Sequence, residues 1–132
     1  MNDLNEIFQV LRTSLQHYQP PLVPKTNTEQ YYDLWSIKPV VIDGRQRREV
    51  FFAGIIIQKS YVGFYYMPVY AEPDLKTVFQ PGLLKLLKGK SCFHIRRLDD
   101  ALLAQVNDAL RIGFELYRKN GWVDEPPQEV PE

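Results

Sequence analysis

The sequence is poor in cysteine: Cys92 is the single one among 132 residues, so no intrachain disulfide can form. Such usage favours a reducing compartment, and we expect a cytoplasmic protein. The N-terminus lacks the basic start and apolar centre of a signal peptide, and no apolar run approaches the ~18 residues of a spanning helix. We therefore expect no membrane partner.

An excess of charge of either sign is also absent, because 16 Lys and Arg balance 16 Asp and Glu and the pI is about 6.7. This balance argues against a protein that coats nucleic acid or anionic membranes. Hydrophobic residues make up 45% of the chain, as in a globular protein. We expect one domain over residues 1–123, followed by a disordered, acidic, proline-rich tail over 124–132.

Catalytic and metal-binding motifs are sparse. Neither His17 nor His94 stands at a diagnostic spacing from a nucleophile or carboxylate, and the seven glycines occur singly rather than in a phosphate-binding pattern. Cys92 and His94 would share one strand face, but two ligands fall short of the three or four that zinc requires. We therefore expect no metal site, no cofactor and no catalytic residue.

Apolar residues at steps of three and four predict two long helices. The first covers residues 2–19, capped by Asn2 or Asp3 and stopped by Pro20. The second covers residues 99–120, with Asp99 as its N-cap. Their apolar stripes are Leu4, Ile7, Phe8, Leu11, Leu15 and Tyr18, and then Leu103, Val106, Leu110, Gly113, Phe114 and Tyr117.

The middle of the chain is rich in β-branched and aromatic residues, which predicts strands at 31–36, 40–42, 50–57, 61–67 and 91–96. Asp43 and Gly44 predict a turn, after which the charged run 45–49 is expected to be a solvated loop. A short helical passage is expected at 74–79, broken at Pro81 and Gly82 and resumed at 83–87. This order predicts an α+β two-layer sandwich with both long helices on one face of an antiparallel sheet.

Such a sheet leaves its second face partly open, and aromatic residues occupy both faces of the 61–67 strand. Tyr61 and Tyr65 alternate with Phe64 and Tyr66, so rings point to either side. One interpretation is a large core with ordinary cross-strand aromatic pairs. The functional interpretation is an exposed aromatic face that binds a ligand or another chain.

Basic residues are concentrated between Asp74 and Asp99, an interval without an acidic residue. They are either solvated side chains of a short helix or part of a local anion site. The members are Lys76, Lys85, Lys88, Lys90, Arg96 and Arg97.

The 91–96 strand connects the two features. If the helices cover Phe93 and Ile95, then Cys92, His94 and Arg96 point to the open face. A cation, an imidazole and aromatic rings together suit a planar anionic ligand or a protein contact. The candidate ligand-binding residues are Trp35, Tyr65, Tyr66, His94 and Arg96.

The run Tyr61-Val62-Gly63-Phe64-Tyr65, the passage 83–90 and the strand 91–95 before a C-terminal helix resemble the YdhG-like family of small bacterial domains. The resemblance covers about two-thirds of the chain. It implies an α+β sandwich comparable with frataxin, and for at least one member the role of an intracellular iron chaperone. Frataxin-type iron binding uses an acidic ridge, to which the first helix here contributes only Asp3 and Glu6.

Three functional hypotheses follow. The leading one is a non-enzymatic cytoplasmic binding domain whose open aromatic and basic face meets a small molecule or a protein, a homodimer included. The second is an iron chaperone of the frataxin type. The third is an enzyme acting on an anionic substrate, for which His94 beside Arg96 is the candidate proton-transfer pair.

Overall fold

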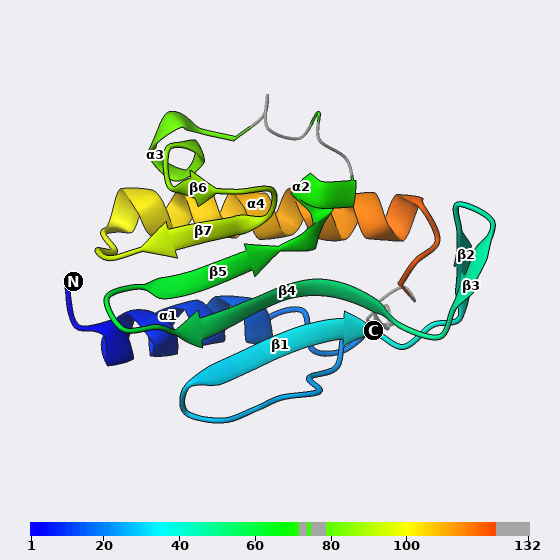
Figure 1. The fold of residues 1–132 in the computed structure, drawn as a ribbon, viewed down its shortest axis with the longest axis horizontal. Coiled ribbons are helices and arrows are strands. Elements are labelled where there is room, and N and C mark those ends of the chain that lie inside the picture. Colours follow the sequence, from blue (N-terminus) through cyan, green and yellow to red (C-terminus); the bar gives the residue numbers. More distant parts are fainter. Residues whose placement is uncertain (72–73, 75–78, 124–132) are drawn as a thin grey trace, which may run out of the picture.

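A five-stranded antiparallel sheet forms the centre of the fold in the computed structural model, which describes residues 1–71, 74 and 79–123 (Figure 1). The strand order is β1-β4-β5-β7-β6. The strands are β1 (Tyr31–Ser36), β4 (Val50–Ile57), β5 (Val62–Tyr66), β7 (Cys92–Ile95) and β6 (Leu87–Lys88). Most of the predicted 74–79 passage and the whole 124–132 tail lie outside the described residues.

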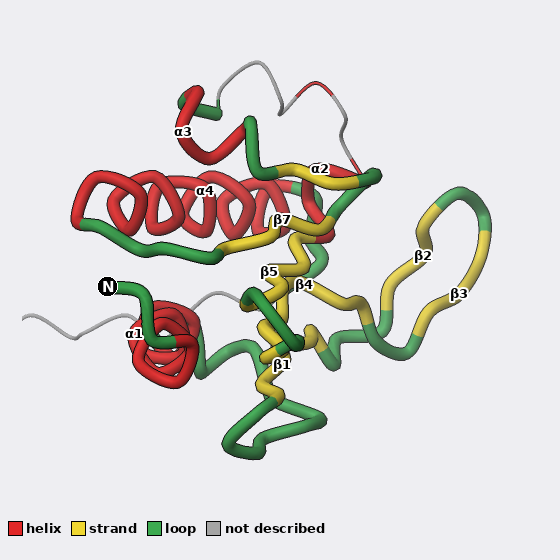
Figure 2. Tube along the Cα trace, turned by 60° about the vertical axis from the view of Figure 1, so that its left-hand side comes forward, coloured by secondary structure: helices red, strands yellow, loops and turns green. Residues whose placement is uncertain are grey.

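The two long helices, α1 (Leu4–Gln16) and α4 (Asp100–Lys119), lie on the same side of the sheet. Figure 2, which views the sheet nearly edge-on, shows both to its left. The short helices α2 (Met67–Ala71) and α3 (Pro81–Leu84) connect β5 to β6. The predicted α+β sandwich is therefore confirmed. In the part of the chain that the structure describes, no helix has the length and apolar character needed to cross a bilayer.

Both long helices begin at the predicted caps. The Asp3 carboxylate accepts from the backbone amides of Asn5 at 2.8 Å and Glu6 at 3.1 Å, and Asp99 accepts from Leu102 at 2.7 Å. The first helix ends at Gln16, three residues earlier than predicted. The amides of the next turn donate to carbonyls three residues back, as that of Gln19 does to Gln16, so the chain tightens before Pro20.

The predicted loop over residues 45–49 is wrong for its first three residues, whereas Arg48 and Glu49 lie outside any strand. Arg45–Arg47 forms β3, which pairs with β2 (Val40–Ile42) in a separate two-stranded ribbon beside the main sheet (Figure 1). The turn lies at the predicted place, because Asp43 and Gly44 both have positive φ, 52° and 77°, as tight hairpins require. All of β3 is exposed, so its sequence carries no apolar alternation to indicate a strand.

The helical segment after residue 80 also differs from the prediction. Pro81 and Gly82 open α3 instead of breaking it, since a proline in the first turn loses no hydrogen bond. Leu87 and Lys88, the former expected in the helix, pair with β7 as the edge strand β6.

Aromatic side chains fill the space between the sheet and the helices. Phe52, Phe64, Tyr66, Phe93 and Tyr117 are all fully buried. The Tyr66 hydroxyl donates to the carbonyl of Ala109, and the Tyr117 hydroxyl donates to the carbonyl of Phe51 at 2.6 Å. These two bonds satisfy the phenols and attach α4 to β5 and β4.

Close approach of α4 to the sheet depends on Gly113. A Cβ at this position would overlap the Tyr66 hydroxyl and lie 2.7 Å from Pro68 Cγ. Gly113→Ala should therefore lower the free energy of unfolding by about 1–3 kcal/mol, although alanine is the better helix former. Chemical denaturation measures the change. An unchanged or higher stability would show that the helix does not approach Tyr66 this closely.

Candidate functional site

The face of the sheet opposite the helices carries four of the five predicted site residues. In the antiparallel register His94 lies across from Gly63, and Cys92 lies across from Tyr65. A Cβ at Gly63 would be only 3.1 Å from Tyr65 Cε2, so the tyrosine ring lies over the glycine. Aromatic rings that cover sheet glycines in this way shield the backbone. Tyr65 is consequently half-buried, and the open face is covered by its own side chains.

Tyr61, His94 and Arg96 form a stacked group at the β7 side of this face. The Tyr61 and His94 rings are nearly parallel, with centroids 3.8 Å apart and planes at 13°. The Arg96 guanidinium lies 5.6 Å from the Tyr61 centroid, within cation–π range. Burial, Arg96 and Lys88 lower the pKa of His94 below its ordinary value, so the imidazole is neutral at neutral pH.

Beside this group is a hollow of about 440 Å³ between α3, β7 and the start of α4, here called the basic cleft. Its charged lining residues are Lys85, Arg96, Arg97 and Asp99, with His94 at one side. The Asp99 carboxylate is engaged in capping α4 through the Leu102 amide. Among the described residues, three cations and one helix-capping carboxylate give the basic cleft a net positive charge.

Tyr66 does not belong to the open face, and its assignment as a ligand-binding residue is wrong. Its side chain is fully buried under α4 and packs against the rings of Phe52, Phe79 and Phe93. Alternation along β5 sends Tyr65 and Tyr66 to opposite faces, so only one of them could point to the open side. Burial raises the pKa of the Tyr66 phenol, which stays protonated.

Trp35 lies on the open face but away from His94 and Arg96. It is on β1, which β4 and β5 separate from β7, so strand spacing alone puts them about 14 Å apart. Trp35 instead lines a second and larger hollow of about 580 Å³, here called the aromatic pocket. Its lining includes Trp35, Phe51, Met67, Tyr117 and Trp122, with Asp43, Arg47 and Glu49 as the charged groups.

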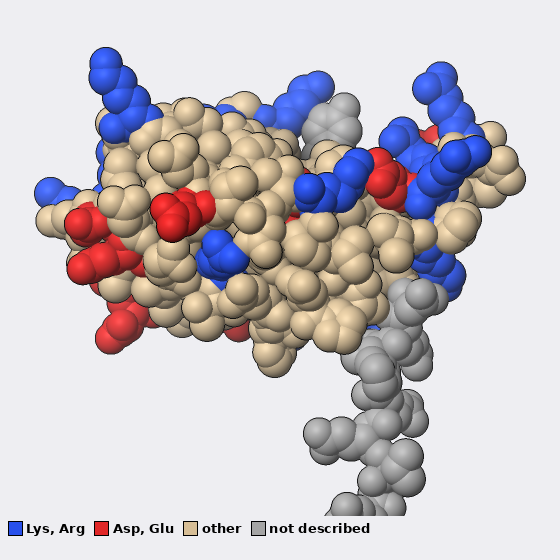
Figure 3. All heavy atoms as spheres, turned by 90° about the horizontal axis from the view of Figure 1, so that it is seen from below, with Lys and Arg blue, Asp and Glu red and all other residues tan. Residues whose placement is uncertain are grey.

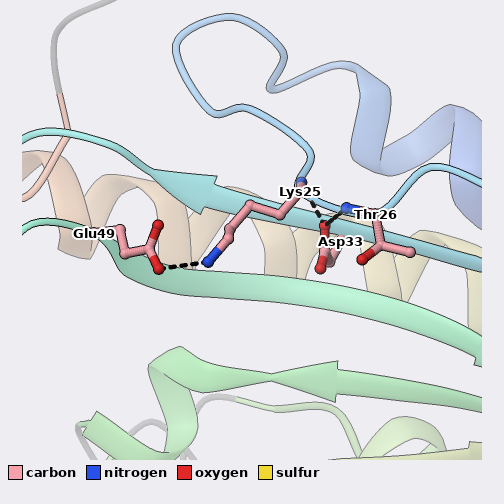
Figure 4. Close-up of polar contacts among 4 residues, drawn as sticks. All are labelled: Lys25, Thr26, Asp33 and Glu49. Atoms are coloured by element: carbon pink, nitrogen blue, oxygen red, sulfur yellow. Dashed lines mark hydrogen bonds and ion pairs between the residues drawn. The ribbon is translucent and has the colours of Figure 1, made fainter.

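A buried carboxylate on β1 holds the preceding segment of the chain, as Figure 4 shows. Asp33 is 3% exposed and accepts from the backbone amides of Lys25 and Thr26, both at 2.8 Å. The segment that contains Lys25 and Thr26 is thereby fixed along β1. The Lys25 side chain reaches Glu49, with Lys25 Nζ 2.5 Å from Glu49 Oε1. The same Nζ lies 4.3 Å from the centroid of the Trp35 ring.

The described residues contain no group of three or more His, Cys, Asp or Glu side chains that could hold a metal ion. Burial raises the pKa of the Cys92 thiol, which disfavours the thiolate form that metals and electrophiles require. Among the described residues, the structure therefore shows no set of ligands for the iron that a chaperone would carry, and no activated thiol at Cys92.

Comparisons with known proteins yield no relative: no family model, no curated protein and no solved structure matches the chain. The candidate sites therefore rest on the geometry of the chain itself.

Sequence reasoning missed several residues of the two sites. Tyr61 was counted among the aromatic residues, yet its contact with His94 depends on the β5–β7 register, which no local pattern reveals. Lys85 and Arg97 lay in the predicted basic interval and do line the basic cleft. Lys25 and Glu49 are far apart in sequence, and no spacing signal could have paired them.

The electrostatics of the basic cleft can be tested through His94. Arg96→Gln should raise the pKa of His94 towards 6.5, because the substitution removes one of the cations that disfavour the imidazolium. Lys88→Gln should produce a smaller rise. Titration of the imidazole by NMR measures both, with Lys119→Gln at the other end of α4 as the control. Equal pKa values in all four proteins would show that Arg96 does not face His94.

The role of Asp33 can be tested through stability. Asp33→Ala leaves two backbone amides without their acceptor and should lower the free energy of unfolding by about 2–4 kcal/mol. Lys25→Gln keeps those amides and loses only an exposed ion pair, so its cost should stay below about 1 kcal/mol. Denaturant unfolding of both variants gives the comparison. Similar costs would contradict the positioning role of Asp33.

Proposed function

We propose that this protein is a non-enzymatic binding domain that takes a small ligand bearing a phosphate or carboxylate group in the basic cleft. The observation that carries the proposal is the convergence of Lys85, Arg96 and Arg97 on one hollow of about 440 Å³, in which Asp99 is the one lining carboxylate among the described residues and caps a helix. Volumes of this order accommodate small organic ligands.

Each cation has a distinct part in this proposal. Arg96 and Arg97 offer planar forks that match the two oxygens of a carboxylate or phosphate, and Lys85 adds a point charge. Tyr61 restrains Arg96 through the ring contact, which lowers the entropic cost of ordering it on binding. The neutral His94 can donate one further hydrogen bond, and it becomes a fourth cation if the bound anion raises its pKa.

In this proposal the aromatic side chains bind the uncharged, ring-bearing part of the ligand. Tyr65 and the stacked Tyr61–His94 pair form a continuous ring-bearing surface over Gly63, next to the basic cleft. A ligand with a flat ring attached to its anionic group could cover this surface while the anion meets the arginines. Exposed Arg–ring contacts contribute only about 0.5–1 kcal/mol each, so affinity depends on several groups acting together.

The same proposal includes the family and the location. The order of hairpin, short helix, strand and final helix supports membership of the YdhG-like family with its frataxin-like sandwich. The single cysteine of the sequence, which can form no intrachain disulfide, supports a reducing cytoplasm, and the family resemblance implies a bacterial one. The partner we propose is a small molecule, with a protein or a second copy of the chain as the alternatives.

Binding of adenosine monophosphate tests the proposal, because adenosine is the same ring system without the anion. We expect the monophosphate to bind and to raise the pKa of His94, and adenosine to bind at least tenfold more weakly. Arg96→Gln should weaken monophosphate binding by roughly 10- to 100-fold, the effect of one charge-assisted hydrogen bond. NMR titration at fixed ionic strength gives both quantities.

The matched control is Lys119→Gln, which removes one positive charge from the opposite end of α4. It should leave binding unchanged, and neither variant should shift the melting temperature appreciably, because Arg96 and Lys119 are both exposed. Equal binding of adenosine and its monophosphate, or equal loss in the two variants, would contradict an anion site at Arg96.

A further inference from the structure

We infer that the aromatic pocket is a site for an organic cation with an alkylated ammonium group, and that the ammonium group of Lys25, which contacts the lining residues Trp35 and Glu49, competes with this ligand in the free protein. The inference is independent of the basic cleft, since the two hollows share no lining residue. It assigns a ligand class to the region around Trp35.

The ammonium group of Lys25 shows which chemistry this region favours. Nζ lies 4.3 Å from the Trp35 ring centroid and 2.5 Å from Glu49 Oε1, so one cation is held by an indole face and a carboxylate together. This is the combination by which proteins bind quaternary and methylated ammonium groups. The side chain of Lys25 is 44% exposed, so it can leave without unfolding its surroundings.

The pocket beside this contact presents further ring faces. Trp35 and Phe51 from neighbouring strands have centroids 5.1 Å apart at 56°, and Trp122 enters from the segment after α4. Trp122 is held in place by an edge contact with Tyr117 at 5.0 Å and by its carbonyl, which accepts from the Ser36 hydroxyl. Three elements thus converge, as in an aromatic cage for a cation.

The charges of the lining agree with a cationic head group. Asp43 and Glu49 contribute two carboxylates, and Arg47 on the β2–β3 ribbon is the opposing charge. Arg47 is exposed, and Figure 3 shows Lys and Arg side chains gathered over the β2–β3 ribbon. The ammonium end of the ligand should therefore lie towards Trp35 and Glu49, with the opposite end of the ligand near Arg47.

Choline is the probe, and 3,3-dimethylbutan-1-ol is its uncharged isostere. Both tryptophans of the chain line the pocket, so intrinsic fluorescence reports occupancy directly. We expect choline to quench or shift the emission in a saturable way and to bind roughly tenfold more tightly than the neutral isostere.

The decisive variant is Lys25→Gln, which removes the internal competitor and keeps the backbone amide that Asp33 fixes. Choline affinity should rise about three- to tenfold in this variant, whereas Glu49→Gln should lower it by a similar factor. Glu115→Gln, which removes a carboxylate from an exposed pair with Arg118 on α4, is the matched control and should change nothing.

Each outcome of these experiments either supports the inference or contradicts it. Tighter choline binding in Lys25→Gln together with weaker binding in Glu49→Gln supports the inference. Equal affinity for choline and its neutral isostere would show a merely apolar pocket and overturn it. The inference also fails if choline does not bind Lys25→Gln, or if that variant binds choline no more tightly than the native protein.

Discussion

The hydrogen bond from the buried Tyr66 hydroxyl to the carbonyl of Ala109 sets the position of α4 on the sheet. It can form only because Gly113 leaves space for the phenol under the helix. Both candidate sites depend on this placement, since the start of α4 forms one wall of the basic cleft and the segment after its end brings Trp122 to the aromatic pocket. A shift of α4 along the sheet would therefore alter both.

A second physical requirement concerns the face of the sheet that no helix covers. Side chains must shield the backbone of this face from water. Tyr65 covers Gly63, and the Phe51 ring lies 3.4 Å from the place that a Cβ on Gly54 would take. Aromatic side chains thus protect the face while leaving polar groups at its two ends. The basic cleft is beside β7 and the Lys25–Glu49 pair is beside β1, so the sheet separates the proposed anion site from the proposed cation site.

Local patterns predicted much of the fold correctly. The caps at Asp3 and Asp99, the β4 and β5 strands and the alternation that buries Phe93 and Ile95 all follow from short-range rules about periodicity and hydrogen bonding. The β3 strand was missed because Arg45–Arg47 is exposed on every residue, which removes the apolar alternation that signals a strand. The start of α3 differs from the prediction because proline, which interrupts the interior of a helix, also suits its first turn.

Short-range patterns were enough to predict both long helices, the strands β1, β2, β4, β5 and β7, the class of the fold and the basic character of the segment before α4, since these depend on neighbouring residues. Which tyrosine of the Tyr65–Tyr66 pair is the more exposed depends on the tertiary fold, because alternation puts the two on opposite faces without indicating which face the helices cover. The tertiary fold also separated Trp35 from His94 and brought Lys25 to Glu49 and Tyr61 to His94. Those distances depend on strand order and register, which long-range packing fixes and local sequence does not encode.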